Sequence, residues 1–267
     1  MPEKMNKMKD KLTIIKVGGK IVEEPGSLDN LLRDFATIDG FKLLVHGGGR
    51  SATKLAGEMG VETRMVDGRR ITDDAMLRIV TMVYGGLVNK TVVAGLQSLG
   101  LDAIGLTGAD LNIIRSHKRP VKDIDYGWVG DVDEVNAGMI AGLLKIGAVP
   151  VIAPLTHDKS GHLLNTNADT MAGETAKAMA ELFDVTLVYC FEKPGVLMDE
   201  NDDSSVIPVI DRKSFSDLVA SGVVNGGMIP KIENSLKAVD AGVSEVIITK
   251  ADSIGDLSAG THVVASM

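Results

Sequence analysis

Two glycine-rich turns, Ile15-Lys16-Val17-Gly18-Gly19 and Val45-His46-Gly47-Gly48-Gly49, each follow directly on a short apolar run. Short apolar runs ended by glycine are typical of buried strands in a parallel sheet. Ligands bind at the strand ends of open α/β sheets, because exposed backbone N–H groups and the start of the next helix attract anions. A tight turn without a ligand would explain one such motif, but two at neighbouring strand ends favour a phosphate-handling site.

The apolar runs alternate along the chain with longer segments of helical period, which predicts βα units around a mostly parallel sheet. The predicted strands cover residues 12–17, 42–45, 102–106, 149–153, 185–190 and 245–249. The predicted helices cover residues 27–38, 50–59, 73–99, 136–146, 167–182, 214–221 and 228–241. Thr72 and Asp73 are start signals for the longest helix. Residues 61–71 and 113–132 alternate like hairpins or lids that enclose a small substrate, and the acidic stretch 198–211 reads as a solvated loop.

The composition is that of a soluble globular protein, with 267 residues of which 45% are hydrophobic and 24% charged. It excludes disordered and fibrous classes. The 28 basic and 36 acidic residues give a net charge of −8, which argues against nucleic acid as a partner, since phosphate-backbone binding needs clustered positive charge. No later run approaches the roughly 18 apolar residues of a membrane span, and the opening stretch lacks the apolar core of a signal peptide. A cytoplasmic protein without a membrane segment is therefore expected.

Cysteine and histidine point away from disulfide and metal chemistry. Cys190 is the single cysteine, so no intrachain disulfide is possible, and its place in an apolar run predicts a small buried side chain. His46 lies against the second glycine turn, and the remaining histidines lack metal-site spacing. No metal ligand is predicted from the protein.

The positive charge of a phosphate site must come from separate side chains, because the chain has neither a Walker A loop nor a strand followed by Gly-x-Gly-x-x-Gly. Lys16 interrupts the first apolar run, where a lysine is costly unless its ammonium group meets a ligand or a partner. The alternative is a strand-end lysine that reaches water. Lys231 stands in the first turn of a helix behind Gly226 and Gly227, and taken alone it is better interpreted as a solvated lysine.

Polar residues of the segment Asn165-Thr166-Asn167-Ala168-Asp169 suit a place beside the glycine turns. Helix capping explains Asn167 and Asp169 but not Asn165, so all three could instead form one polar face that holds a substrate. Arg69 and Arg70 lie on the first lid, and a guanidinium binds a carboxylate through two parallel hydrogen bonds. A surface salt bridge is the alternative for these arginines.

These segments, taken in order, resemble the amino acid kinase family and, within it, the acetylglutamate kinase branch. The resemblance runs from about residue 12 to the end and rests most on His46-Gly47-Gly48-Gly49, Asn165-Thr166-Asn167-Ala168-Asp169 and Gly227-Met228-Ile229-Pro230-Lys231. Other matching segments are Val88-Asn89-Lys90, Gly127-Trp128-Val129-Gly130 and Gly260-Thr261. The resemblance implies a three-layer αβα sandwich around a mostly parallel central sheet. It also implies transfer of the γ-phosphoryl group of ATP, with Mg²⁺ held mainly by the nucleotide, to the side-chain carboxylate of N-acetylglutamate in arginine biosynthesis.

The resemblance assigns roles residue by residue. It implies that Lys16 and Lys231 stabilise the transferring phosphoryl group while Asp169 holds both ammonium groups. Phosphate contacts fall on Gly18, Gly19 and Gly48, and acyl-amino-acid contacts on Gly48, Gly49, Arg70, Asn165 and Asn167. The nucleotide-binding segments correspond to Glu192, Lys193, Pro194, Gly195, Val196, Leu197, Val223, Val224 and Asn225.

The expected organisation is a charged leader, 1–11, before a single kinase domain, 12–267. Its N-lobe, about 12–160, would bind the acyl amino acid, and its C-lobe, about 161–267, the nucleotide. The leader is too short for the additional N-terminal helix of arginine-inhibited relatives, which predicts an arginine-insensitive homodimer with the 73–99 helix at the contact, although that helix suits the core almost as well. Alternatives are an N-succinylglutamate kinase, a carbamate, uridylate, aminoadipate-type, aspartate or free glutamate kinase of the same fold, and a non-catalytic binding protein.

Overall fold

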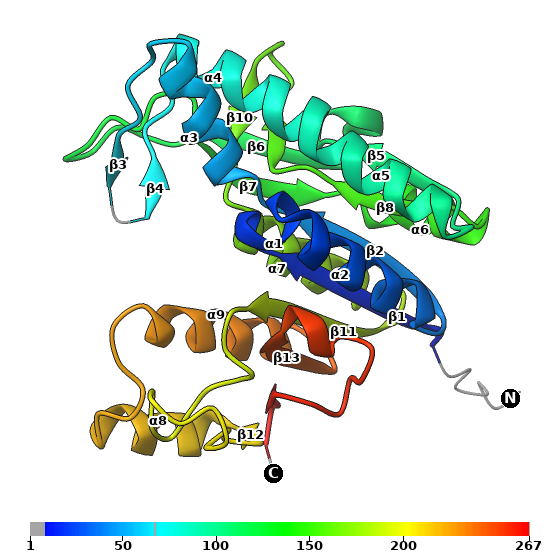
Figure 1. Ribbon diagram of the computed structural model, residues 1–267, viewed down its shortest axis with the longest axis vertical. Helices are drawn as coiled ribbons and strands as arrows, with labels where there is room; N and C mark the ends of the chain where they lie inside the picture. Colours follow the sequence, from blue (N-terminus) through cyan, green and yellow to red (C-terminus); the bar gives the residue numbers. More distant parts are fainter. Residues whose placement is uncertain (1–8, 67, 267) are drawn as a thin grey trace, which may run out of the picture.

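An eight-stranded sheet forms the centre of the computed structural model, which describes residues 9–66 and 68–266 (Figure 1). Its strand order is β12-β14-β13-β11-β1-β2-β8-β5, and only the β13–β14 pair is antiparallel. The strands are β1 (Lys11–Val17), β2 (Phe41–His46), β5 (Ala103–Leu106), β8 (Val149–Ile152), β11 (Asp184–Phe191), β12 (Val209–Ile210), β13 (Glu245–Lys250) and β14 (Thr261–Val263). Every strand predicted from the sequence is confirmed, and β12 and β14 are additional.

Helices cover both faces of this sheet, which confirms the three-layer αβα sandwich. They are α1 (Gly19–Glu23), α2 (Pro25–Thr37), α3 (Gly49–Glu58), α4 (Asp74–Val80), α5 (Asn89–Ser98), α6 (Ala137–Lys145), α7 (Ala168–Met179), α8 (Arg212–Ala220) and α9 (Met228–Asp240). One core cluster joins the sheet to α6, α7 and α9, and the other joins it to α2, α4 and α5. Each predicted helix is present within a few residues, and only the single turn and a half of α1 was not predicted.

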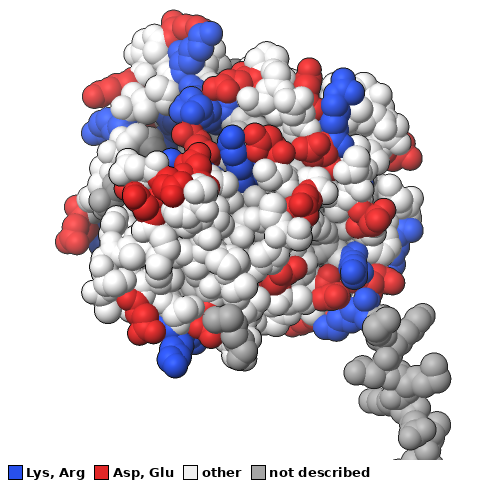
Figure 2. All heavy atoms as spheres, turned by 60° about the horizontal axis from the view of Figure 1, so that its bottom comes forward, with Lys and Arg blue, Asp and Glu red and all other residues white. Residues whose placement is uncertain are grey.

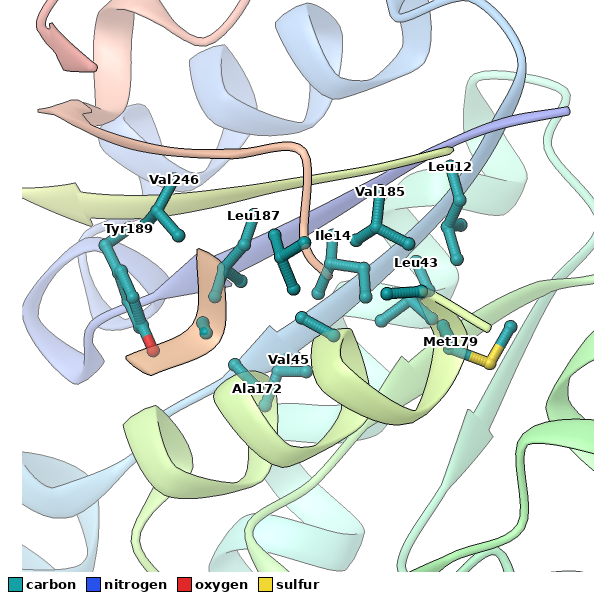
Figure 3. Packing of buried hydrophobic residues seen from close by; sticks show 14 of the residues in the cluster. Leu12, Ile14, Leu43, Val45, Ala172, Met179, Val185, Leu187, Tyr189 and Val246 are labelled. Atoms are coloured by element: carbon teal, nitrogen blue, oxygen red, sulfur yellow. The ribbon is translucent and has the colours of Figure 1, made fainter. Parts of the chain in front are cut away.

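Residues that alternate along the central strands supply the two core clusters. Leu12 and Ile14 of β1 face α7 in Figure 3, together with Leu43 and Val45 of β2. Ile15 and Val17 of β1 face the opposite side of the sheet. Because both faces are covered, β1 is buried from Leu12 to Val17, and this accounts for the largely apolar run in the sequence.

The longest helix begins where the sequence predicts it, but it is not a uniform α-helix. The side chain of Asp73 caps it by accepting a hydrogen bond from the Met76 N–H group, at 2.8 Å. Between α4 and α5 the chain forms a π-helical segment, η1 (Thr81–Val88). A π segment inserts an extra residue into the turn, so it changes which side chains face the sheet after it.

Two smaller sheets confirm the predicted hairpins. β3 (Met65–Val66) and β4 (Arg69–Arg70) form the first hairpin, which stands beside α3 in Figure 1. β6 (Ile114–Lys118) and β7 (Gly130–Val135) form the second, and with β9 (Leu155–His157) and β10 (Leu163–Asn165) they build a four-stranded sheet of order β10-β9-β6-β7. The acidic stretch 198–211 is a largely exposed loop until β12, as expected.

The expectation that no segment is long and apolar enough to span a membrane is wrong on length and composition. The continuous helical run Asp74–Ser98 has 25 residues and a mean hydropathy of 1.4 in its most apolar window. Core helices of soluble proteins meet the same criterion, and Ile79, Val83 and Val92 of this run are buried against the sheet.

On the face shown in Figure 2, basic and acidic side chains are interspersed rather than gathered by sign.

Residues 1–8 of the predicted leader lie outside the described residues, and β1 begins at Lys11, the last residue of the leader. The expectation built on the leader, insensitivity to arginine, stays a prediction.

Candidate active site

The two glycine turns meet at the carboxyl ends of the adjacent strands β1 and β2. The Gly47 N–H group donates to the Val17 carbonyl at 2.9 Å, which links the turns directly. A Cβ atom on Gly47 would lie 2.9 Å from the Gly19 nitrogen, and one on Gly19 would lie 3.2 Å from the nitrogens of both Gly48 and Gly49. The prediction that both turns lie at neighbouring strand ends is therefore confirmed, and the close approach of the two backbones requires glycine there.

Each turn begins a helix whose first N–H groups are available to an anion. α1 starts at Gly19 and α3 at Gly49. The Ser51 N–H group of α3 donates to the Glu23 carboxylate at 2.7 Å. Among described residues, no acceptor is bound to the N–H groups of Gly48 and Gly49. This end of the sheet therefore keeps backbone donors for a ligand, as helix N-termini that bind phosphate do.

Lys16 enters the site from β1 and is paired with a carboxylate from α7. The residue is 8% exposed, and its Nζ lies 2.7 Å from Asp169 Oδ1. Asp169 stands in the first turn of α7, which Asn167 caps by accepting from the Thr170 N–H group at 2.9 Å. Of the two interpretations of Lys16, a lysine that simply reaches water is wrong, and a paired, buried ammonium group is confirmed.

Lys231 approaches the same carboxylate from α9 without forming the same ion pair. Its Nζ lies 4.0 Å from the centre of the Phe191 ring, a cation–π contact. Burial lowers the pKa of Lys231, the negative charge of Asp169 opposes that change, and the positive charge of Lys16 adds to it. These electrostatic effects show that Asp169 and both lysines share one local field. The resemblance implied that Asp169 holds both ammonium groups. In the structure Asp169 forms an ion pair with Lys16, whereas Lys231 contacts the Phe191 ring.

Two adjoining cavities open beside this charged group, and Asp169 and Lys231 line the second of them, whereas Lys16 is not among the residues that line either. The first has a volume of about 190 Å³, and the second, of about 690 Å³, reaches to α9. Residues lining the first include Gly47, Gly48, Gly49, Met65, Arg70, Tyr84, Val129, Pro154, Asn165 and Asn167. Residues lining the second include Asp169, Thr170, Gly173, Glu174, Lys177, Tyr189, Phe191, Gly227, Lys231 and Lys237. Gly68, Arg69 and Asn167 line both, so the cavities meet beside Asp169.

Arg70 is a buried cation held by neutral groups. It is 7% exposed, and its Nη2 donates to the Gly49 carbonyl at 2.8 Å and to Thr53 Oγ1 at 2.9 Å. No carboxylate of the described residues forms an ion pair with it. For Arg70, the interpretation as a surface salt bridge is therefore wrong among the described residues. A buried guanidinium in a cavity and without an acid partner suits an anionic ligand.

Asn165 and Asn167 share the wall of the first cavity, while Asn167 and Asp169 share that of the second. The Asn165 Nδ2 group donates to Thr72 Oγ1 at 2.9 Å, and that hydroxyl donates to the Arg70 carbonyl at 3.0 Å. Asn165 thus ties β10 to the strand that carries Arg70. The three residues therefore do not face one cavity as expected from the sequence. Asn165 lines the first cavity, Asp169 lines the second, and Asn167, at the start of α7, lines both.

The segments expected beside the nucleotide lie near the second cavity but do not supply the side chains that line it. Glu192 follows the cavity residue Phe191 and forms an exposed ion pair with Lys20 at 2.8 Å, while Lys193 pairs with Asp203. The side chains of Val196 and Val224 are buried in the core. The other expected residues are Pro194, Gly195, Leu197, Val223 and Asn225, and none of them is among the residues that line either cavity.

Aromatic residues of the site escaped the sequence analysis. Tyr189 and Phe191 stand two positions apart at the end of β11 and therefore face the same cavity, a spacing that the apolar run concealed. Tyr84 packs on the second turn, since a Cβ atom on Gly48 would lie 2.8 Å from its ring. Cys190, between the two aromatics, points to the other side and is buried, and burial raises the pKa of its thiol to about 12. Its interpretation as a small buried side chain is confirmed.

Comparison with known proteins places this arrangement in a family. The model of the amino acid kinase family matches residues 11–250. The chain is 69% identical to the acetylglutamate kinase of Phocaeicola vulgatus over 93% of this chain and 97% of that one. It is 66% identical to the acetylglutamate kinase of Bacteroides thetaiotaomicron over 96% of this chain and 99% of that one. A solved structure, smu.665 from Streptococcus mutans UA159, superposes with a TM-score of 0.77 at 29% identity, covering 95% and 98% of the two chains.

Proposed function

The chain belongs to the amino acid kinase family, and from that premise we propose that it is an acetylglutamate kinase. It transfers the γ-phosphoryl group of ATP to the side-chain carboxylate of N-acetyl-L-glutamate, and the product is an acyl phosphate for arginine biosynthesis. The observation that carries this function on the structural side is that Asp169 and Lys231 line the larger of two adjoining cavities, close to where the two meet, and that Lys16 is paired with Asp169.

The smaller cavity is the site for N-acetylglutamate. Its volume of about 190 Å³ is below the roughly 300–1,000 Å³ typical of cavities for drug-sized ligands, whereas the second cavity, of about 690 Å³, lies within that range. Arg70 binds the α-carboxylate of the amino acid, because its guanidinium is buried without an acid partner among described residues. Asn165 and Asn167 offer amide groups to the acylated nitrogen and its carbonyl. The γ-carboxylate of the substrate then points to the glycine turns.

Phosphoryl transfer takes place between the two cavities. An oxygen of the γ-carboxylate attacks the γ-phosphorus of ATP, a new P–O bond forms, and the bond from that phosphorus to the β–γ bridging oxygen breaks, so ADP leaves with the electron pair. No general base is needed, because a free side-chain carboxyl group is ionised at neutral pH. Lys16 and Lys231 stabilise the charge on the transferring group, and the N–H groups of Gly19 and Gly48 donate to its oxygens. Asp169 keeps Lys16 in place.

ATP occupies the second cavity, and the phosphates point to Lys231 and Lys16. Lys237 lines this cavity in addition, which suits a polyanionic ligand, and so does Lys177, which pairs with Glu174 at 2.6 Å. The described residues include no group of three or more His, Cys, Asp or Glu side chains placed to hold a metal ion. Mg²⁺ carried by the phosphates of ATP would supply further charge neutralisation at this cavity.

Two further features complete the proposal. The residues lining the first cavity come largely from the predicted N-lobe and those lining the second from the predicted C-lobe, so each lobe, about 12–160 and about 161–267, carries one substrate. The enzyme acts in the cytoplasm, where ATP and the amino acid precursors are present.

A direct assay tests the function. ATP-dependent acyl phosphate formation is trapped with hydroxylamine for N-acetylglutamate, N-succinylglutamate and free glutamate at equal concentrations. We expect N-acetylglutamate to be phosphorylated fastest. A preference for the succinyl compound would change the acyl group but keep the class, whereas no hydroxamate from any of the acceptors would overturn the proposed kinase.

Lys16→Ala and Lys231→Ala should each lower kcat by on the order of a hundredfold, because each removes one preorganised positive charge from the transferring group. The dissociation constant for ATP, measured by calorimetry, should rise by much less, about tenfold or below. Lys54→Ala, an exposed position on α3, is the matched control and should leave kcat unchanged. Equal losses in kcat and in ATP affinity would mean that the lysines bind the ground state only.

Arg70→Lys should raise the KM for N-acetylglutamate by on the order of tenfold or more, since a hydrogen bond to a charged group contributes about 1.5–3 kcal/mol and the two-pronged contact is lost. The KM for ATP should stay near the wild-type value. Arg64→Lys, on the same lid but exposed, provides the comparison. An unchanged KM for the acyl amino acid would remove Arg70 from the substrate site.

A homodimer is proposed, with contact through the long helix. Met82 is 49% and Leu87 63% exposed on η1, and Met82 lines an apolar hollow of about 500 Å³ together with Leu77, Trp128 and Leu163, among others. Met82→Glu combined with Leu87→Glu should convert the dimer to a monomer in sedimentation velocity. Ile146→Glu, at a residue 78% exposed on another surface, should remain dimeric. A monomeric wild-type protein, or a double variant that is still dimeric, would refute this contact.

A further inference from the structure

A buried histidine lies directly beneath the second glycine turn and has no part in the mechanism above. His46 is the last residue of β2 and is 0% exposed. Asn89, the first residue of α5, is 1% exposed and faces it from the long helix. Lys90 follows at the surface. The sequence shows both the histidine and the Val88-Asn89-Lys90 segment, but neither the composition nor the spacing explains why polar side chains should be buried here.

The hydrogen bonds of this group allow only one arrangement of donors and acceptors. The Asn89 Nδ2 group lies 2.9 Å from the Val151 carbonyl, which can only accept, and Lys90 Nζ, which can only donate, lies 3.0 Å from Asn89 Oδ1. These two contacts set the orientation of the amide. Its second N–H therefore donates to His46 Nε2, at 3.1 Å, so that nitrogen carries no proton.

The other ring nitrogen of His46 must then be the donor. His46 Nδ1 lies 2.7 Å from the Gly47 carbonyl oxygen, and a neutral ring with Nε2 unprotonated has its proton on Nδ1. Burial lowers the pKa of His46 to about 4, so the ring is neutral at physiological pH. The side chain thus donates one hydrogen bond to the backbone of the turn that follows it.

That hydrogen bond constrains a backbone donor of the site. The Gly47 carbonyl and the Gly48 N–H group belong to one planar trans peptide unit, in which the two bonds point in opposite directions. If His46 holds the carbonyl on the sheet side of the turn, the Gly48 N–H group is directed to the other side, where Gly48 lines the first cavity. Rotation of this one peptide would remove the donor from the cavity.

We propose that His46, oriented by Asn89 and Lys90, is a positioning residue that keeps the Gly48 N–H group directed at the phosphoryl group. The proposal rests on the kinase function above and deepens it. His46 itself does not touch a substrate. It acts through the peptide unit between Gly47 and Gly48, and its cost of burial is offset because every polar atom of the ring and of the Asn89 amide is satisfied.

The surrounding backbone is shaped around this group. Gly105 on β5 has no room for a side chain, because a Cβ atom there would lie 1.9 Å from Asn89 Oδ1 and 2.5 Å from Lys90 Nζ. Lys90 Nζ also donates to the Gly105 carbonyl at 3.1 Å. The π segment η1 ends at Val88, so the same stretch of helix places Tyr84 against Gly48 and Asn89 against His46. The second glycine turn is therefore supported from both sides by one helix.

Two conservative variants separate the two ring nitrogens. His46→Asn keeps a donor near the position of Nδ1, and His46→Gln keeps an acceptor near the position of Nε2. We expect His46→Asn to retain kcat within about threefold and His46→Gln to lose on the order of tenfold to a hundredfold, because a displaced donor misses the transition state. The KM for N-acetylglutamate should change by no more than about twofold in both. Leu44→Val, at a fully buried residue of the same strand, is the control for stability loss alone.

A kcat for His46→Gln equal to that of Leu44→Val, or no advantage of His46→Asn over His46→Gln, would overturn the positioning role. Two spectroscopic measurements are independent of turnover. In the wild-type protein the ¹⁵N signals of the His46 ring should show a protonated Nδ1 and an unprotonated Nε2 from pH 6 to 8, and the opposite tautomer would overturn the proposal. The Gly48 amide signal should shift on addition of ATP in the wild type and in His46→Asn but not in His46→Gln, and equal shifts in both variants would also overturn it. If the wild type forms no acyl phosphate, the proposed function fails while these spectra still decide whether the turn is held by His46.

Discussion

A buried ammonium group on the central strand is the constraint on which the site depends. Lys16 is 8% exposed between the buried apolar residues Ile15 and Val17 of β1, so its charge needs a partner, and Asp169 provides one from the first turn of α7. That partner can stand there only because β10 leads into a helix whose N-terminus points at the end of β1. The ion pair therefore links the sheet to the segment that separates the two cavities.

The charges around this pair explain how an acidic protein accommodates acidic substrates. The chain as a whole has a net charge of −8, yet Lys16 and Lys231 share the field of one carboxylate, Asp169, and Arg70 is buried without an acid partner among the described residues. Burial lowers the pKa of Lys231, which means that contacts within the protein do not fully offset the loss of solvation of its ammonium group. In the proposed reaction the negative charge of the phosphoryl group in transfer would be placed beside these cations.

Much of this structure could be predicted from the sequence where one physical cause dominates. The inner strands are buried on both faces and so appear as apolar runs, whereas β12 and β14, short and near the sheet edge, do not. Lys16 was found because it breaks an apolar run. Phe191 was missed because an aromatic residue at a strand end looks like core, and the π segment was missed because its residues keep an apolar character that fits an ordinary helix. The partners of Lys16, Lys231 and Arg70 stand on segments that are distant in the sequence, so the sequence alone could not identify these contacts.

In the proposed mechanism the two lysines near Asp169 stabilise the phosphoryl group in transfer more than they bind the nucleotide in the ground state. The most direct measurement is the affinity of the wild type and of Lys16→Ala for ADP with aluminium fluoride, a planar mimic of that group, in the presence of Mg²⁺ and N-acetylglutamate, compared with their affinity for ATP. The account predicts that the variant loses on the order of a hundredfold in affinity for the mimic and much less for ATP. Equal losses for the mimic and for ATP would contradict it.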